Sequence, residues 1–296
     1  MTPIEYCQEK AAKSGSSFYY AFLFLPPERR LAITALYAFC REVDDVVDEC
    51  SDESIARIKL AWWRTQIEAM FQGKPDHPVT KALSPWLVKF NITSERLNAI
   101  VDGMEMDLNQ TRYLDWTGLR HYCWHVAGVV GELSASIFGY TDEKTLTYAG
   151  HLGLAFQMTN IIRDVGDDAR RGRIYLPIED LQKFNIKAAD ILNGKHTEGF
   201  EALMAFEAER TRQLYADAIA SLNEADRRSQ RPGLMMAAIY YSLLDEIQLE
   251  KWQVLDQRIS LTPLRKLWLA WKNWVLGGKS VIKQIKQGRL TSKKLR

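Results

Sequence analysis

The chain has 296 residues, of which 47% are hydrophobic and 26% are charged, the balance of a globular protein with a substantial core. Its 17 glycines and 9 prolines are too few for long disordered stretches. A formal net charge of only +2 argues against a protein dedicated to binding nucleic acid.

Helical periodicity dominates the whole chain, and strand-type alternation over several residues is hard to find. Pro26-Pro27 followed by Glu28 is typical of a helix start, because proline suits the first turn and an acid suits the positive N-terminal end. We expect helices over residues 27–49, 53–72, 79–90, 94–108, 116–138, 142–166, 178–185, 197–223, 232–248 and 262–276. The sequence therefore predicts an all-α catalytic domain over residues 1–278, followed by a basic C-terminal tail over residues 279–296.

The N-terminal residues 1–17 are polar and lack the apolar core of a secretory signal peptide. The four cysteines show no C-x-x-C spacing, so reduced thiols and a cytoplasmic location are expected. No stretch of about 20 uninterrupted apolar residues exists, so no transmembrane helix is expected.

Residues 41–49, REVDDVVDE, form the first of two acidic segments. Residues three and four apart share one face of a helix, so Tyr37, Arg41, Asp44 and Asp48 line one stripe, beside an apolar stripe that would face a core. The β-carbons of Asp44 and Asp48 would lie about 6 Å apart, where like charges repel unless a cation lies between them. Carboxylate oxygens completed by water and phosphate suit Mg²⁺, so this stripe is a candidate metal site.

Residues 157–168, QMTNIIRDVGDD, form the second acidic segment, in which Asn160, Asp164 and Asp168 recur every four residues. One acidic stripe on a helix is usually a solvated face. These acids, however, are embedded in apolar sequence, occur in two segments and have arginines such as Arg163 beside them. We therefore predict two acidic helices that face each other across a cavity and are bridged by Mg²⁺ and a diphosphate.

Between the two acidic segments, the sequence VAGVVG at residues 126–131 contains two glycines, Gly128 and Gly131. Small residues allow a second helix or a long lipid chain to approach closely. Ordinary helix packing and a role in the cavity are both open interpretations.

The C-terminal region is strongly basic, because Lys251–Arg296 holds twelve lysines and arginines and one acid, Asp256. Tryptophans and leucines between residues 267 and 276 are interleaved with lysines, a pattern that can lie in a membrane interface. This interpretation predicts peripheral contact with an anionic membrane, at its inner face, through the basic tail. The alternative is a tryptophan-rich helix that closes the domain, followed by 18 disordered basic residues.

These segments together resemble the squalene/phytoene synthase family over nearly the whole chain. The matching sequences are SSFYYAF at 16–22, YAFCR at 37–41, DDVVD at 44–48, YCWHVAGVVG at 122–131, NIIRDVGDD at 160–168 and GRIYLP at 172–177. Within the family, residues 14–49 and PLRKLW at 263–268 are most similar to bacterial presqualene diphosphate synthases of hopanoid biosynthesis.

The resemblance implies a single-domain isoprenoid-synthase helical fold with a central active-site cavity, and a prenyltransferase that depends on Mg²⁺ or, as a substitute, Mn²⁺. The metal ligands that it implies are Asp44, Asp48, Asn160, Asp164 and Asp168. The substrate-binding residues that it implies are Ser17, Phe18, Arg41, Gln157, Arg163 and Arg173. The catalytic residues that it implies are Tyr37, Arg41, Tyr122, Arg163 and Tyr175.

The expected reaction joins two farnesyl diphosphates head to head into presqualene diphosphate, which downstream squalene-forming enzymes would consume. The alternatives are a phytoene synthase acting on geranylgeranyl diphosphate, and a full squalene or dehydrosqualene synthase. No G-x-G-x-x-G unit between a strand and a helix is found. The closer resemblance implies a reaction that stops at presqualene diphosphate, so NADPH is not expected.

Overall fold

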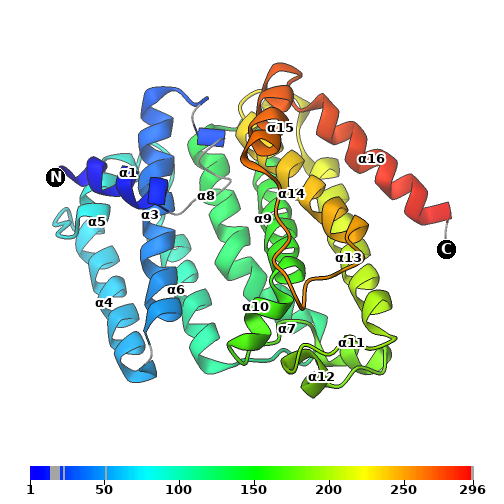
Figure 1. Cartoon of the computed structure of the whole chain (residues 1–296). Helices are drawn as coiled ribbons and strands as arrows, with labels where there is room; N and C mark the ends of the chain where they lie inside the picture. The colour runs from blue at the N-terminus through cyan, green and yellow to red at the C-terminus, as the bar shows by residue number, and fades with distance from the viewer. Residues whose placement is uncertain (14–20, 23, 51, 295–296) are drawn as a thin grey trace.

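The computed structural model describes residues 1–13, 21–22, 24–50 and 52–294. These residues form helices and no β-strand, and the backbone pairs in strand-like fashion only at an isolated bridge between Arg112 and Ile174. The long helices stand side by side in Figure 1, with the N-terminus and the C-terminus on opposite sides. The predicted all-α, single-domain fold is confirmed.

The helices follow one another around a shared core. The first part of the chain forms α1 (Pro3–Lys13), α3 (Pro27–Glu49), α4 (Glu53–Phe71), α5 (Pro78–Leu83), the 3₁₀ turn η1 (Ser84–Trp86) and α6 (Ser94–Asn109). The middle forms α7 (Trp116–Cys123), the π-helical segment η2 (Trp124–Gly128), α8 (Val129–Phe138), α9 (Lys144–Arg163) and α10 (Val165–Arg170). The last part forms α11 (Ile178–Lys183), α12 (Ala188–Leu192), α13 (Phe200–Ser221), the 3₁₀ turn η3 (Glu224–Asp226), α14 (Arg231–Leu249), α15 (Pro263–Val275) and α16 (Lys279–Lys294).

Several helices start where the sequence indicates. Pro27 opens α3 with Glu28 in its first turn, as expected. The Asp52 carboxylate caps α4 by accepting hydrogen bonds from the backbone of Ser54 and Ile55, which satisfies amides that have no partner inside the helix. The helix expected over residues 79–90, in contrast, ends at Leu83 and gives way to the 3₁₀ turn. Helices α1 and α12 were not expected from the sequence.

The single helix expected over residues 116–138 is interrupted by the π-helical segment Trp124–Gly128. A π-turn carries an extra residue and often occurs at functional sites. The glycines there allow α8 to lie directly on α9, since a β-carbon on Gly131 would meet the carbonyl oxygen of Ala149 at 2.2 Å. Close helix packing at Gly131 is confirmed, and this glycine also lines the central cavity.

The helix expected over residues 142–166 ends at Arg163, and α10 starts at Val165. At this break the Gly166 amide donates to the carbonyl oxygen of Val254, 3.1 Å away in the loop between α14 and α15. A β-carbon on Gly166 would lie 2.4 Å from the carbonyl oxygen of Leu255, so only glycine lets this loop approach. The loop over residues 250–262 therefore packs against the second acidic segment.

The predicted basic tail is helical over Lys279–Lys294 and packs against α13 and α14. Val281 and Ile285 are buried there, so the alternative of a disordered end is wrong for the described part of the tail. In the part of the chain that the structure describes, no helix combines the length and apolar composition needed to cross a membrane.

Candidate active site

A cavity of ≈ 230 Å³ lies among α3, α8, α9 and α14. Its lining along α9 extends from Tyr148 to Asn160, roughly 18 Å at the rise of an α-helix. Most of the lining is apolar, but Arg41 and Asp44 on α3 and Gln157 and Asn160 on α9 place polar groups near one end. The cavity thus has an apolar body and a charged end, which suits a lipid chain with an anionic head.

The first acidic segment lies on the last turns of α3. Val43 and Val47 are buried in the core, as the predicted apolar stripe requires. Arg41 binds both Asp44 and Asp45 through its guanidinium group. Burial raises the pKa of Asp44 to about 6, and repulsion from Asp48 adds to this rise, while Arg41 opposes it. The wall therefore presents crowded carboxylates that a cation would stabilise.

The second acidic segment bridges the break between α9 and α10. The Asp164 amide donates to the Asn160 carbonyl oxygen at 2.8 Å, and the Asp168 amide donates to the Asp164 carbonyl oxygen at 2.8 Å. These hydrogen bonds keep the helical spacing across the break, so the three side chains stay on one side. Burial and repulsion from Asp164 raise the pKa of Asp168 to about 7.

The two acidic segments face each other. Arg173 and Arg171, which follow the second segment, place nitrogens 3.8 Å and 3.5 Å from an oxygen of Asp48 in the first. Asp107 of α6 lies near both segments, because repulsion from its carboxylate contributes to the raised pKa of Asp44 and of Asp168. The arginines that follow the second segment therefore contact the end of the first.

Two tyrosines predicted at the reaction centre converge on Asp107. Tyr122 donates to one of its carboxylate oxygens at 2.8 Å, and Tyr175 donates to the other at 3.0 Å. The two rings stack with their centroids 5.4 Å apart. Tyr122 lines the cavity, as does the third predicted tyrosine, Tyr37.

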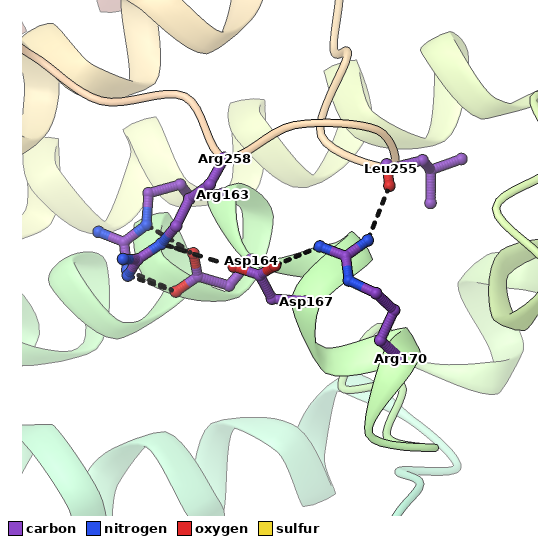
Figure 2. A network of polar contacts seen from close by, with 6 residues as sticks. All are labelled: Arg163, Asp164, Asp167, Arg170, Leu255 and Arg258. Atoms are coloured by element: carbon purple, nitrogen blue, oxygen red, sulfur yellow. Dashed lines mark hydrogen bonds and ion pairs between the residues drawn. The ribbon is translucent and has the colours of Figure 1, made fainter.

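Figure 2 shows the arginines that surround Asp164. The Nε atoms of Arg163 and Arg258 both donate to Asp164 Oδ1, at 2.7 Å and 2.8 Å. Burial opposes the ionisation of Asp164, but the hydrogen bonds from these arginines outweigh it and lower its pKa. Arg170 also donates to the carbonyl oxygen of Leu255, at 3.3 Å. The loop after α14 is thus bound to the second acidic segment by arginines from both sides.

The donor atoms at the charged end fit Mg²⁺, which prefers oxygen ligands. The Oδ1 atom of Asn160 is buried and accepts no hydrogen bond from any described residue, which leaves it available to a cation. No three His, Cys, Asp or Glu side chains of the described chain gather closely enough to enclose a metal ion by themselves. An ion held by fewer protein ligands would need water and a bound diphosphate to complete its coordination.

Not every predicted site residue can be placed. Ser17 and Phe18 lie outside the described residues. Gln157 lines the cavity one turn before Asn160, and Arg173 is half-buried beside Asp48. The remaining predicted residues lie around the charged end of the cavity, on α3, on α7, or between Asn160 and Tyr175.

Three further charged residues at this site were not identified from the sequence: Asp107, Arg258 and Lys266. Asp107 could have been found, because it is an acid on the buried side of an amphipathic helix, one turn from Met104. The sequence around Arg258 contains no pattern that identifies this arginine as a site residue. Burial and the charges of Arg163 and Arg258 lower the pKa of Lys266, so this lysine belongs to the same cationic group.

The chain is similar to known proteins over most of its length. A model of the squalene/phytoene synthase family matches residues 11–265 of the chain. A phytoene synthase from Arthrospira platensis is 36% identical over 279 residues, which cover 89% of this chain and 89% of that protein. A 15-cis-phytoene synthase from Synechocystis is 34% identical over 282 residues, which cover 90% of this chain and 84% of that protein.

Solved structures show the same fold. A dehydrosqualene synthase in complex with a ligand superposes with a TM-score of 0.81 at 27% identity, covering 95% of this chain and 97% of that one. The squalene synthase HpnC from Alicyclobacillus acidocaldarius superposes with a TM-score of 0.75 at 26% identity, covering 84% of this chain and 94% of that one. The matched family region includes both acidic segments.

Proposed function

The chain belongs to the squalene/phytoene synthase family, and on that premise we propose that it joins two farnesyl diphosphates head to head into presqualene diphosphate. The observation that carries the proposal is the pair of acidic segments facing each other at one end of an apolar cavity. An isoprenoid chain would occupy the apolar body, and its diphosphate would lie at the charged end.

We assign the metal-binding role to five residues around the charged end: Asp44, Asp48, Asn160, Asp164 and Asp168. Bound Mg²⁺, or Mn²⁺ in its place, would neutralise the diphosphate as its bond to carbon breaks. The buried, unpaired Oδ1 atom of Asn160 and the crowding of Asp44 by Asp48 support this assignment.

Arg41, Arg163 and Arg173 would hold the diphosphates. Each lies beside a carboxylate of an acidic segment, and this location at the proposed metal site supports the assignment. Guanidinium groups bind phosphate oxygens with two parallel hydrogen bonds, which fixes the orientation of the leaving group. Arg258 and Lys266 add positive charge at the same place.

The apolar body of the cavity would protect the reacting carbons from water. When the first substrate loses diphosphate, C1 becomes an allylic cation, which the faces of Tyr37 and Phe156 on the cavity lining would attract. The 2,3 double bond of the second substrate attacks C1, and loss of one proton closes a cyclopropane. The products are presqualene diphosphate, diphosphate and a proton. The released diphosphate and the Tyr122–Asp107–Tyr175 network are the two candidate proton acceptors.

The second candidate function is that of a phytoene synthase, with two geranylgeranyl diphosphates as substrates. The curated relatives described above favour it by name, at 36% and 34% identity. The squalene and dehydrosqualene synthases among the solved structures favour the shorter substrate. Both proposed functions use the same acidic segments, and they differ in the length of the isoprenoid substrate that the cavity would bind.

A product assay tests the proposal. The protein is incubated with Mg²⁺ and either farnesyl or geranylgeranyl diphosphate, with and without NADPH, and the products are identified by mass spectrometry. Presqualene diphosphate from the farnesyl substrate, independent of NADPH, is the expected result. Preferential turnover of the geranylgeranyl substrate would support the phytoene synthase. Squalene or dehydrosqualene as the product would identify a full synthase, and no product from either substrate would contradict both functions.

A further inference from the structure

One face of α15 exposes an apolar stripe to solvent. Leu264, Trp268, Trp271 and Val275 follow one another at intervals of four, three and four residues, so they lie on one side of the helix. Leu264 is 80% exposed, Trp268 is 52% exposed, Trp271 is 54% exposed and Val275 is 57% exposed. A contiguous apolar patch of this kind on a folded protein usually marks a binding surface.

The stripe is held in place by the opposite side of α15. Leu269, Ala270 and Asn273 are buried there, so the helix cannot turn its tryptophans inward without exposing these residues. The Asn273 side chain also accepts a hydrogen bond from the Val281 amide at 3.1 Å, which connects α15 to α16. The apolar stripe is therefore a preformed surface.

Basic residues are exposed on α15 and on the helix that follows it. The ammonium group of Lys272 lies 4.8 Å from the centre of the Trp268 ring. On α16, the exposed Lys279, Lys283 and Lys286 line a groove together with Arg227. Helices α15 and α16 thus expose large apolar side chains and lysines close together in sequence, the composition that binds anionic membrane surfaces.

Acidic residues are scarce here. From Gln257 to Arg296 the sequence contains eleven lysines and arginines and no acid. Two acids of neighbouring elements are already paired, Glu246 with Arg265 and Glu224 with Arg227. A symmetric contact between two copies would bring two lysine-rich surfaces together, which repulsion disfavours.

We propose that the exposed stripe of α15 and the lysines of α16 bind the surface of an anionic lipid bilayer, with Trp268 and Trp271 at the level of the headgroups. Tryptophan prefers this level because its ring is apolar and its N–H group is polar. The tail predicted as a membrane contact thus contributes charge, while the apolar anchor lies one helix earlier.

The same helix borders a groove that meets the lining of the cavity at one residue. Trp274 lines a groove together with Phe24 and Pro232, and Pro232 also lines the central cavity. The groove and the cavity therefore share a wall. A bilayer seated on α15 would lie close to the site where a lipid-like product forms.

Vesicle flotation with the full chain tests this proposal without using enzyme activity. The wild-type protein should float with vesicles containing phosphatidylglycerol and much less with pure phosphatidylcholine vesicles, and added salt should weaken binding. Trp268→Ser combined with Trp271→Ser should lower the partition coefficient by roughly a hundredfold, because two large side chains lose their burial. Replacing Lys279, Lys283 and Lys286 by glutamine should lower it by a similar factor.

The matched control is Ile58→Ser combined with Val88→Ser, two exposed apolar residues on other elements, which should bind vesicles like the wild type. Circular dichroism checks that every variant is folded. Equal binding of the tryptophan variant and the wild type would overturn the proposal. It would also be overturned by a wild-type protein that ignores anionic vesicles, or by one whose tryptophans instead mediate dimerisation in sedimentation experiments.

Discussion

Some single residues around the cavity have surroundings that favour the binding of a cation or a proton at the expense of the stability of the fold. Burial, together with nearby carboxylates, raises the pKa of Asp44 and of Asp107 to about 6. Neutral side chains of the same size would remove this repulsion. Buried carboxylates whose pKa is raised by neighbouring carboxylates are characteristic of sites that bind a cation or transfer a proton.

Asparagine in place of Asp44 should lower turnover about a hundredfold or more, because it removes a charged ligand from the wall of the cavity. The protein should remain folded, since the substitution opens no cavity and removes a repelled charge. Steady-state turnover and the midpoint of thermal unfolding measure the two effects. Glu28→Gln, at the exposed start of the same helix, is the control and should leave turnover unchanged. Near-normal turnover in the Asp44 variant would refute the assignment of a metal ligand.

Glu207 is a further buried acid, and it does not line the cavity. Arg210 donates to Glu207 at 2.8 Å and to Asp180 at 2.7 Å. Burial nevertheless raises the pKa of Glu207 to about 8, from an ordinary value of 4.5. Between these two values the folded protein binds a proton that the unfolded chain does not bind. The free energy of unfolding should therefore fall as the pH rises through this window.

Glu207→Gln should flatten this part of the stability profile and raise the free energy of unfolding at alkaline pH, because the buried group no longer ionises. Urea unfolding from about pH 5 to about pH 9 measures the profile. Glu201→Gln, an exposed position on the same helix, should behave like the wild type. Parallel profiles for the wild type and the Glu207 variant would show that this carboxyl does not contribute.

At the scale of elements, the close contact between α8 and α9 depends on glycines, which carry no side chain. A β-carbon on Gly131 would meet the Ala149 carbonyl at 2.2 Å, and one on Gly153 would meet the Ala127 carbonyl at 2.3 Å. In both cases the obstacle is backbone, which cannot rotate away like a side chain. Because α9 carries Gln157 and Asn160 into the cavity, the separation of the two helices also sets the geometry of the site.

Gly131→Ala should therefore destabilise the protein by about 2 kcal/mol, within the usual range for overpacking, and should also lower turnover. Gly118→Ala is the matched control, since a β-carbon there has no neighbour closer than 3.5 Å. The control should be neutral or up to about 1 kcal/mol more stable, because alanine favours the helical conformation. Denaturant unfolding compares the two. If Gly131→Ala unfolded with the same free energy as the Gly118→Ala control, the two helices would be able to move apart without loss of stability.

At the scale of the molecule, the site is assembled from distant parts of the chain. α3, the break between α9 and α10, and the loop before α15 all contribute charged groups to it (Figure 1). The C-terminal helix completes the body, because its Val281 and Ile285 are buried and its Gln284 donates to Asp245 at 3.0 Å. The last helix is thus part of the folded unit.

A chain that ends at Gly278 should lose about 2 to 5 kcal/mol of unfolding free energy, since two buried aliphatic side chains and their contacts disappear. Its residual folded fraction should retain turnover, because the acidic segments lie elsewhere. Thermal unfolding and turnover per folded molecule measure the two quantities. An unchanged unfolding midpoint would instead indicate that α16 contributes no stability.

Much of the site could be predicted because its determinants are local. Asp44 and Asp48 share a face of α3 through helical spacing alone, and the residues around them are recognisable as a family pattern. Asp107 and Arg258 were missed because their roles come from segments that meet only in space. The break at Asp164 was missed because the Gly166 amide leaves the helix for a carbonyl about ninety residues away in sequence.

The sequence by itself determined the helical class, most helix starts and the two acidic stripes, since periodicity and capping act over a few residues. Only the tertiary structure decided that the stripes face one another, that Arg258 closes on Asp164, and that the basic tail docks while α15 exposes its tryptophans. These features depend on which distant surfaces are buried against each other. That choice is made by the packing of the whole core, and no short stretch of sequence encodes it.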